Sequence, residues 1–360
     1  MKKELLVASA LVSTMGLAGV AEAASATMSG HTRVGVTGTD LDSGGDATYG
    51  GSQLSTFAVS ISETTDSGIK ISTGFDLTNE SDGATDPSGL TLTFTDGSKL
   101  DLIEAGNASS SHAVGVPGAS GEQGVTNSSL NAAPTALTMG DTSDSVGFEY
   151  HTAADAFGVE GLKAGVSASF NSDAAKSSDN TTAVVETAYA VGVTYVTDAG
   201  DSTVTVGGGV VSAEFNNSNL TKDTEVFNIG LTAVTGDLTV GVGYAAGDYV
   251  HSNSSTASTT TADATEVDNA SAVTAGAKYV SGDMTFAIGV ASGEGNDGTL
   301  GSAATGSADT YDSLGASVDY VIISGVTATF GYSDTEEKAA ATATTASSGT
   351  SWYIGANISF

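Results

Sequence analysis

The sequence feature that most constrains the fold is an alternation of apolar and polar residues with a period of two. Successive side chains of a β-strand point to opposite faces, so this period marks strands with one apolar face. One clear segment places Val146, Phe148 and Tyr150 opposite Gly147 and Glu149. Segments of this kind, each about ten residues long, recur about sixteen times along the chain, which is the pattern of a membrane-spanning barrel.

The connections between these segments alternate between short and long. Short turns fall near residues 64, 96, 200, 236, 281 and 323, and longer polar stretches fall near 80, 106–143, 172, 216, 248–269, 292–309 and 335–349. Only the turn at 154–160 is long on the short side. Tight turns on one rim and long loops on the other are typical of outer-membrane barrels. We therefore predict an all-β fold, a transmembrane antiparallel β-barrel of about sixteen strands with both ends on the tight-turn side.

The alternative fold is a soluble β-sandwich or a solenoid adhesin, whose apolar strand faces would be buried in a core. Two observations favour the barrel: the second strand face is mostly Gly, Ser and Thr, and aromatic residues stand at strand ends on the apolar face. Aromatic rings are favoured where hydrocarbon meets water. The expected membrane-interface residues are Tyr195, Tyr244, Tyr279, Tyr320, Trp352 and Phe360.

The N-terminus carries the signature of a secretory signal peptide. Lys2 and Lys3 precede an apolar run from Leu5 to Val20, and Ala21-Glu22-Ala23 offers a small-residue cleavage site. The run is short and interrupted for a membrane anchor, because a spanning helix needs about 20 apolar residues. We expect residues 1–23 to be the signal peptide and residues 24–360 to form one barrel domain.

Charge and cysteine content exclude several classes of function. The chain has 10 Lys and Arg against 42 Asp and Glu, a formal net charge of −32, and removal of residues 1–23 leaves this balance unchanged. Such a surface repels nucleic acid, whose phosphates are bound by basic residues, and favours cations as small partners. The chain has no cysteine, which excludes thiol chemistry and a small disulfide-stapled domain. An acidic disordered tract would share this composition, but it would not alternate regularly.

Several charged residues share the polar strand face, which would line the barrel interior. They could set ion preference, as charged side chains do in pores; alternatively, they are solvated or strand-pairing residues without selectivity. The gap at 106–143 is the longest strand-free stretch, and a barrel interior gives it somewhere to fold. The candidate pore-lining and constriction residues are His31, Arg33, Lys70, Lys99, Glu149, His151 and Lys163 on strands, and Glu122, Asp141 and Asp144 on the long loop.

Neither a cofactor nor catalysis is expected. Acidic stretches such as Asp40-Leu41-Asp42 and Asp334-Thr335-Glu336-Glu337 could bind Ca²⁺, which prefers carboxylate and carbonyl oxygens; ordinary solvated loop charge is the alternative. A hydrolase would need a nucleophile beside a base. The four histidines are assigned to strands, His31 and His151, or to loops, His112 and His251, and none lies in a nucleophile elbow.

Three segments resemble the Rhodobacter-type general porin family of alphaproteobacteria: residues 29–36, residues 64–69 and the terminal Ile358-Ser359-Phe360. The resemblance covers the first hundred residues in order and the strand plan of the rest. It implies a homotrimer of sixteen-stranded barrels in the outer membrane, among lipid and lipopolysaccharide. It also implies a third loop folded into the lumen as a constriction, and a terminal Phe that is read by the barrel-assembly machinery. This sequence departs from the family in one respect. The loop has few acidic residues and the barrel wall has few basic residues, among which Arg33 is the only arginine.

We therefore expect a general diffusion porin, which passes ions and small hydrophilic solutes passively and prefers cations, because a passage lined by net negative charge concentrates them. Two alternatives remain open. One is a surface-exposed barrel or adhesin with a closed lumen, and the other is a substrate-specific channel.

Overall fold

The computed structural model describes residues 24–41, 46–78, 85–87, 89–102, 107–118, 145–171, 185–215, 223–252, 264–299, 308–338 and 348–360. The expected signal peptide lies outside these residues. Among the described residues, no helix is long and apolar enough to cross a membrane.

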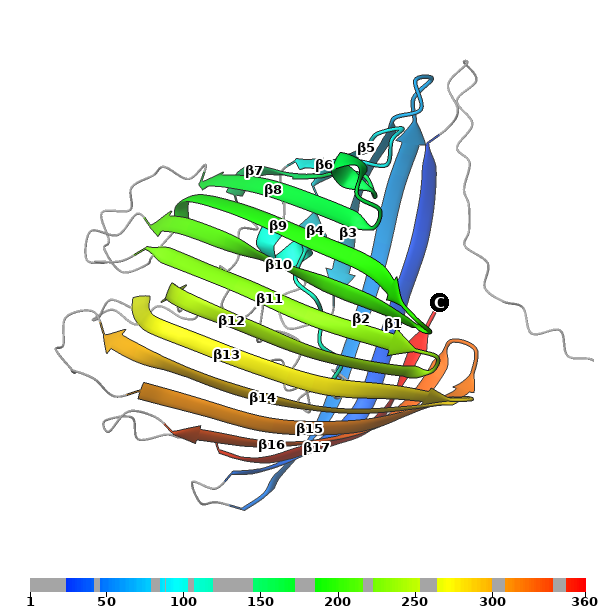
Figure 1. Cartoon of the computed structure of the whole chain (residues 1–360). Helices are drawn as coiled ribbons and strands as arrows, with labels where there is room; N and C mark the ends of the chain where they lie inside the picture. Colours follow the sequence, from blue (N-terminus) through cyan, green and yellow to red (C-terminus); the bar gives the residue numbers. More distant parts are fainter. Residues whose placement is uncertain are drawn as a thin grey trace, which may run out of the picture.

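The described chain forms one closed antiparallel sheet (Figure 1). Consecutive strands pair around the ring, and β1 closes it by pairing with both β2 and β17. The strands are β1 (Ser25–Leu41), β2 (Thr48–Thr64), β3 (Lys70–Thr78), β4 (Thr85–Pro87), β5 (Leu90–Thr93), β6 (Lys99–Leu102), β7 (Ser145–His151), β8 (Leu162–Asn171), β9 (Val185–Ala199), β10 (Ser202–Phe215), β11 (Thr224–Thr235), β12 (Leu238–Ser252), β13 (Ala264–Ser281), β14 (Met284–Thr299), β15 (Ala308–Ile323), β16 (Val326–Lys338) and β17 (Gly349–Ser359); the helical turns are α1 (Ala108–Ser111) and η1 (Ala156–Gly158).

The seventeen strand elements make a barrel of sixteen strands, as predicted. β4 pairs with β3 from Phe75 to Leu77, and β5 pairs with β3 from Lys70 to Ser72. β4 and β5 are therefore two successive pieces of one wall strand. Pro87, at the end of β4, lacks the N–H that continuous ladder pairing requires.

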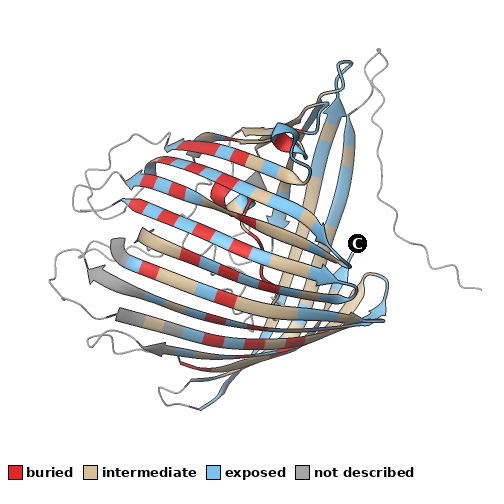
Figure 2. Ribbon diagram, in the orientation of Figure 1, coloured by how far each residue is buried: buried red, intermediate tan, exposed pale blue. Residues whose placement is uncertain are grey.

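Burial alternates along the strands with the predicted period of two. In β11 the residues from Thr224 to Leu231 are buried and exposed in strict alternation. From Phe227 onward the exposed positions are apolar, including Ile229, and the buried positions are Asn228 and Gly230. Figure 2 shows this red and pale-blue alternation on β11 and on part of β9. The apolar face therefore points out of the barrel and the small, polar face points into it, the reverse of a soluble protein.

The two rims differ as expected. On the tight-turn rim a glycine with positive φ stands in each short turn, where residues with a Cβ are strained: Gly68, Gly97, Gly200, Gly236, Gly282 and Gly325. The longer turn between β7 and β8 holds η1. The chain end lies on this rim too, where Phe360 continues the ladder by exchanging two backbone hydrogen bonds with Gly30 of β1.

Several strands on the opposite rim extend farther than predicted. Asp334 and Glu336 lie on β16, and Asp40 lies on β1, so these acids are on strand ends and not in loops. His251 likewise lies on β12. The alternation argument missed these extensions because the strands continue beyond the apolar band, where the outward positions become polar. Asp42 lies outside the described residues.

Candidate functional site

An inserted segment, residues 107–118, lies inside the barrel against its inner wall (Figure 1). It starts with Asn107, whose side chain accepts a hydrogen bond from the backbone N–H of Ser109 and so caps α1. α1 contacts β7, β8, β9 and β10. The long gap at 106–143 was thus correctly predicted to fold into the lumen, as far as its described part shows, but it begins with a helical turn that the sequence did not reveal.

Hydrogen bonds to three wall side chains hold the inserted segment. The N–H of Ala108 donates to Ser167 Oγ at 3.0 Å, and Asn228 Nδ2 donates to Ser109 Oγ at 2.7 Å. Nδ1 of His112 lies 2.9 Å from Thr194 Oγ1. These contacts reach β8, β11 and β9, so the segment is fixed to three strands of one side of the barrel.

Glycines of the inner wall make room for the inserted segment. Gly165, Gly192 and Gly209 are direct cross-strand partners on β8, β9 and β10. A Cβ on Gly192 would overlap the carbonyl oxygen of Ala108 and lie 2.7 Å from Cβ of His112. Farther along, the segment covers four more wall glycines, where an added Cβ would meet His112, Val114 or Pro117: Gly207, Gly230, Gly241 and Gly276. These seven glycines form a patch of the inner wall, here called the glycine floor, against which the backbone of residues 108–117 packs.

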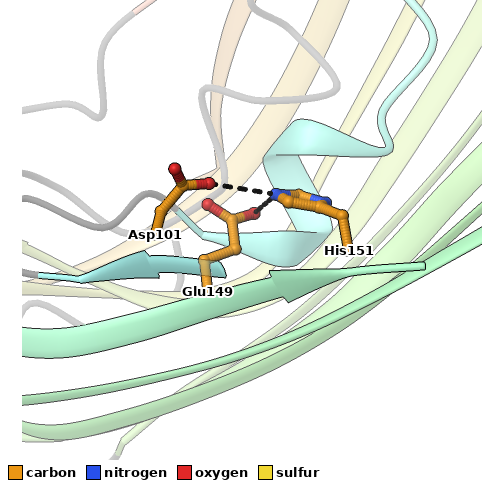
Figure 3. Close-up of side chains that lie close together, drawn as sticks. All are labelled: Asp101, Glu149 and His151. Atoms are coloured by element: carbon orange, nitrogen blue, oxygen red, sulfur yellow. Dashed lines mark ion pairs between the residues drawn. The ribbon is translucent and has the colours of Figure 1, made fainter. Parts of the chain in front are cut away.

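A polar cluster lies beside α1, formed by Asp101 of β6 and by Glu149 and His151 of β7 (Figure 3). Nε2 of His151 lies 3.3 Å from Glu149 Oε1 and 3.8 Å from Asp101 Oδ2. Register places the side chains on one face, because Asp101 is the cross-strand partner of Glu149. Glu149 is only 3% exposed, so the cluster sets a carboxylate into a largely desolvated position.

His112 connects the inserted segment to this cluster. Its Nε2 lies 3.4 Å from Nδ1 of His151, and the two rings are 5.4 Å apart between centroids. Burial lowers the pKa of His112 below its ordinary value, and nearby His151 acts in the same direction. His112 is therefore neutral at neutral pH, and its two ring nitrogens form hydrogen bonds with Thr194 and His151.

The predicted pore-lining residues on strands occupy the inward face, as their cross-strand partners show. Lys70, Lys99 and Lys163 are exposed, and His31 and Arg33 are half-buried. Glu149 differs, because the inserted segment and its neighbours cover it instead of leaving it on an open surface. The predicted loop acids Glu122, Asp141 and Asp144 lie outside the described residues. The structure thus brings together Glu149 and His151, with Lys99 as the cross-strand partner of His151.

The aromatic residues named from the sequence lie on the outward face in two bands. Tyr195, Tyr279, Tyr320 and Phe360 stand close to the tight turns, and Tyr244 and Trp352 lie toward the other rim. Ring pairs extend both bands: Phe57 with Phe360, Tyr49 with Trp352, Phe170 with Tyr189, and Phe227 with Tyr244.

Sequence reasoning missed Asp101 and His112 as neighbours of Glu149 and His151. Asp101 could have been found, since pairing β6 with β7 in register puts it opposite Glu149. His112 carried no such signal, because no ladder relates an inserted segment to the strand that it touches. For the seven glycines of the floor, the sequence predicted only that they are small residues on the inward strand face.

Comparison with known proteins shows which family this barrel resembles in sequence and which solved structures share its fold. Residues 8–340 match the family of Gram-negative porins. No curated protein sequence matches significantly. Among solved structures, the chain is similar to a porin refined at 1.8 Å resolution, with 20% identity and a TM-score of 0.60 over 93% of this chain and 100% of that one. It is similar to an anion-selective porin from Comamonas acidovorans, with 16% identity and a TM-score of 0.61 over 94% and 100% of the two chains.

A third similar structure is the trimer form of OmpT, an outer membrane protein of Vibrio cholerae, with 14% identity and a TM-score of 0.58 over 94% of this chain and 100% of that one. These identities show a shared fold, and the family match covers most of the chain. With its closed barrel, outward apolar face and inserted segment, this outer-membrane chain belongs to the Gram-negative porin family.

Proposed function

We propose that this porin is a general diffusion channel, which passes ions and small hydrophilic solutes passively and prefers cations. The observation that carries the proposal is the inserted segment on its glycine floor. It is fastened to one side of a closed barrel, where it narrows the interior by a fixed amount. A barrel with a small, polar inner face and a fixed constriction is suited to sorting solutes by size and charge.

Side-chain charge, and not the fold, supports the cation preference. A porin with the same fold is described as anion-selective, so the architecture is compatible with either sign. This chain carries a formal net charge of −32. Acidic residues such as Asp334 and Glu336 stand on strand ends at the long-loop rim, where a negative potential would raise the local cation concentration. The inner wall carries both signs, so we expect a moderate preference.

Planar-bilayer recording tests this proposal directly. Purified protein is added to a bilayer separated by a tenfold KCl gradient, and the current is measured at a series of voltages. We expect discrete conductance steps and a reversal potential of the sign that K⁺ would give. Absence of steps would refute the channel, and a reversal potential of the opposite sign would refute cation preference while leaving the channel intact.

We also propose a homotrimeric assembly. The support is the fold shared with the Vibrio cholerae protein whose structure is a trimer form and the continuous apolar outer face, part of which neighbouring barrels could cover. Light scattering of the detergent-extracted protein, corrected for bound detergent, should give three times the chain mass of 35.3 kDa less any cleaved leader. A mass of one chain would contradict the assembly.

A further inference from the structure

The polar cluster has the composition and spacing of a transition-metal site. Its three candidate ligand atoms, one each from Asp101, Glu149 and His151, all lie within 4.8 Å of one another. Bonds of about 2.0–2.2 Å in a tetrahedral zinc site place ligand atoms about 3.3–3.6 Å apart. The observed separations of 3.3 Å and 3.8 Å from His151 Nε2 bracket this range. Only a small side-chain adjustment is therefore needed to centre an ion.

The hydrogen bonds around the cluster leave Asp101 Oδ2 and Glu149 Oε1 facing Nε2 of His151. Thr91 donates its hydroxyl to Asp101 Oδ1, so Oδ2 is the oxygen that faces His151. Glu149 is 3% exposed, and apart from Nε2 of His151, 3.3 Å away, its Oε1 has no polar partner within the described part of the chain. A buried carboxylate oxygen without a donor is costly unless a cation compensates it.

A relay of hydrogen bonds fixes which nitrogen of His151 faces the carboxylates. The Thr194 hydroxyl donates to the carbonyl oxygen of His112 at 3.2 Å, so its oxygen accepts from Nδ1–H of His112. Nε2 of His112 then accepts from Nδ1–H of His151. In neutral His151 the lone pair of Nε2 therefore points at two carboxylates, an arrangement that either a bound cation or a second proton on Nε2 would stabilise. Ligating histidines are oriented by such bonds to the second ring nitrogen.

We propose that Asp101, Glu149 and His151 bind a divalent transition-metal ion beside the inserted segment of this porin. One imidazole and two carboxylates suit Zn²⁺ and its neighbours, whereas Ca²⁺ takes six to eight oxygen ligands. Three protein ligands leave a fourth position for water. Lys99 is the cross-strand partner of His151, so its positive charge opposes binding in part. The bound ion would add positive charge at the constriction and reduce cation current.

Zinc titration of the metal-stripped, full-length protein in detergent tests binding. Isothermal titration calorimetry with ZnCl₂ at neutral pH should show one strong site in the wild type, in addition to any weak sites of the acidic rim. Glu149→Gln and His151→Gln each preserve hydrogen-bonding capacity but remove a ligand, and each should weaken the strong site by at least about tenfold, the loss that even outer-shell changes can cause. The matched control is Glu160→Gln in the exposed turn before β8, which should bind zinc as the wild type does.

Anomalous diffraction from zinc-soaked crystals of the wild type locates the ion independently of any variant. We expect a peak between Asp101, Glu149 and His151. Circular dichroism checks that each variant forms the barrel. Absence of the peak, absence of a strong site, or unchanged zinc affinity in both variants would overturn the proposal.

Current measurement links the site to conduction, and this arm alone rests on the proposed channel function. Micromolar ZnCl₂ should lower the wild-type potassium current reversibly and leave the Glu149→Gln current unaffected. A protein that binds zinc at the cluster but conducts nothing would refute the channel and retain the site. Equal zinc block in wild type and Glu149→Gln would refute the link between this site and the current.

Discussion

Replacing Gly192 by Ala should release the inserted segment from the barrel wall. The added Cβ would overlap the carbonyl oxygen of Ala108 and lie 2.7 Å from Cβ of His112. β9 is paired on both sides, with Gly165 and Gly209 opposite Gly192, so the wall has little freedom to move away. The segment must yield instead.

The magnitude follows from what holds the segment in place. Its hydrogen bonds to Ser167, Asn228 and Thr194 contribute a net stabilisation of about 0.5–1.5 kcal/mol each. Overpacking by one methyl group typically costs about 1–3 kcal/mol. A penalty of about 2 kcal/mol lowers the ratio of docked to undocked segment by about 30-fold, which is comparable to the whole stabilisation from these bonds.

Single-channel recording measures this change. We expect Gly192→Ala to raise the mean conductance and the open-channel noise, because the constriction is no longer fixed. The matched control is Gly51→Ala on β2, where an added Cβ meets nothing within 4 Å and the conductance should equal that of the wild type. If Gly192→Ala conducts with wild-type amplitude and noise, the glycine floor does not position the segment.

Three further changes test other parts of the structure. Lys163→Glu, on the exposed inward face of β8, should shift the reversal potential in a KCl gradient further toward K⁺; an unchanged potential would remove Lys163 from the pore lining. Gly35→Ala should destabilise the barrel by about 1–3 kcal/mol in urea unfolding, because the added Cβ would overlap the ring of Tyr353, which is only 1% exposed; Gly51→Ala is again the control. Hydrogen bonds from the hydroxyl and N–H of Ser98 lower the pKa of Asp96, so this turn gains stability above the ordinary carboxyl pKa of 3.8 and loses it as the pH falls through the lower folded value. Urea unfolding should therefore show that Ser98→Ala destabilises the protein at pH 7 and much less at about pH 2; an equal effect at both pH values would contradict this.

The strand plan could be predicted from the sequence because a barrel repeats one local rule. Each hairpin buries no core of its own, so the alternation of Val146, Phe148 and Tyr150 with their polar neighbours already determines which face meets lipid. The prediction failed at strand ends such as Asp334 and Glu336. The strands remain paired there beyond the apolar band. Because backbone pairing does not require alternating polarity of the side chains, these strand ends could not be recognised from the sequence.

The constriction could be predicted only as a gap, since its position depends on contacts that follow no period. In a single strand, Gly192 and Gly209 look like the many other small inward residues of a barrel. Only the register shows that Gly165, Gly192 and Gly209 stand side by side, and only the inserted segment shows why they lack a Cβ. A row of glycines across neighbouring strands weakens the sheet, because glycine loses the most conformational entropy on folding and offers no side chain for packing. The row of glycines therefore lowers the stability of the sheet. It also allows the backbone of residues 108–117 to approach the wall closely, and the contacts formed there offset that loss.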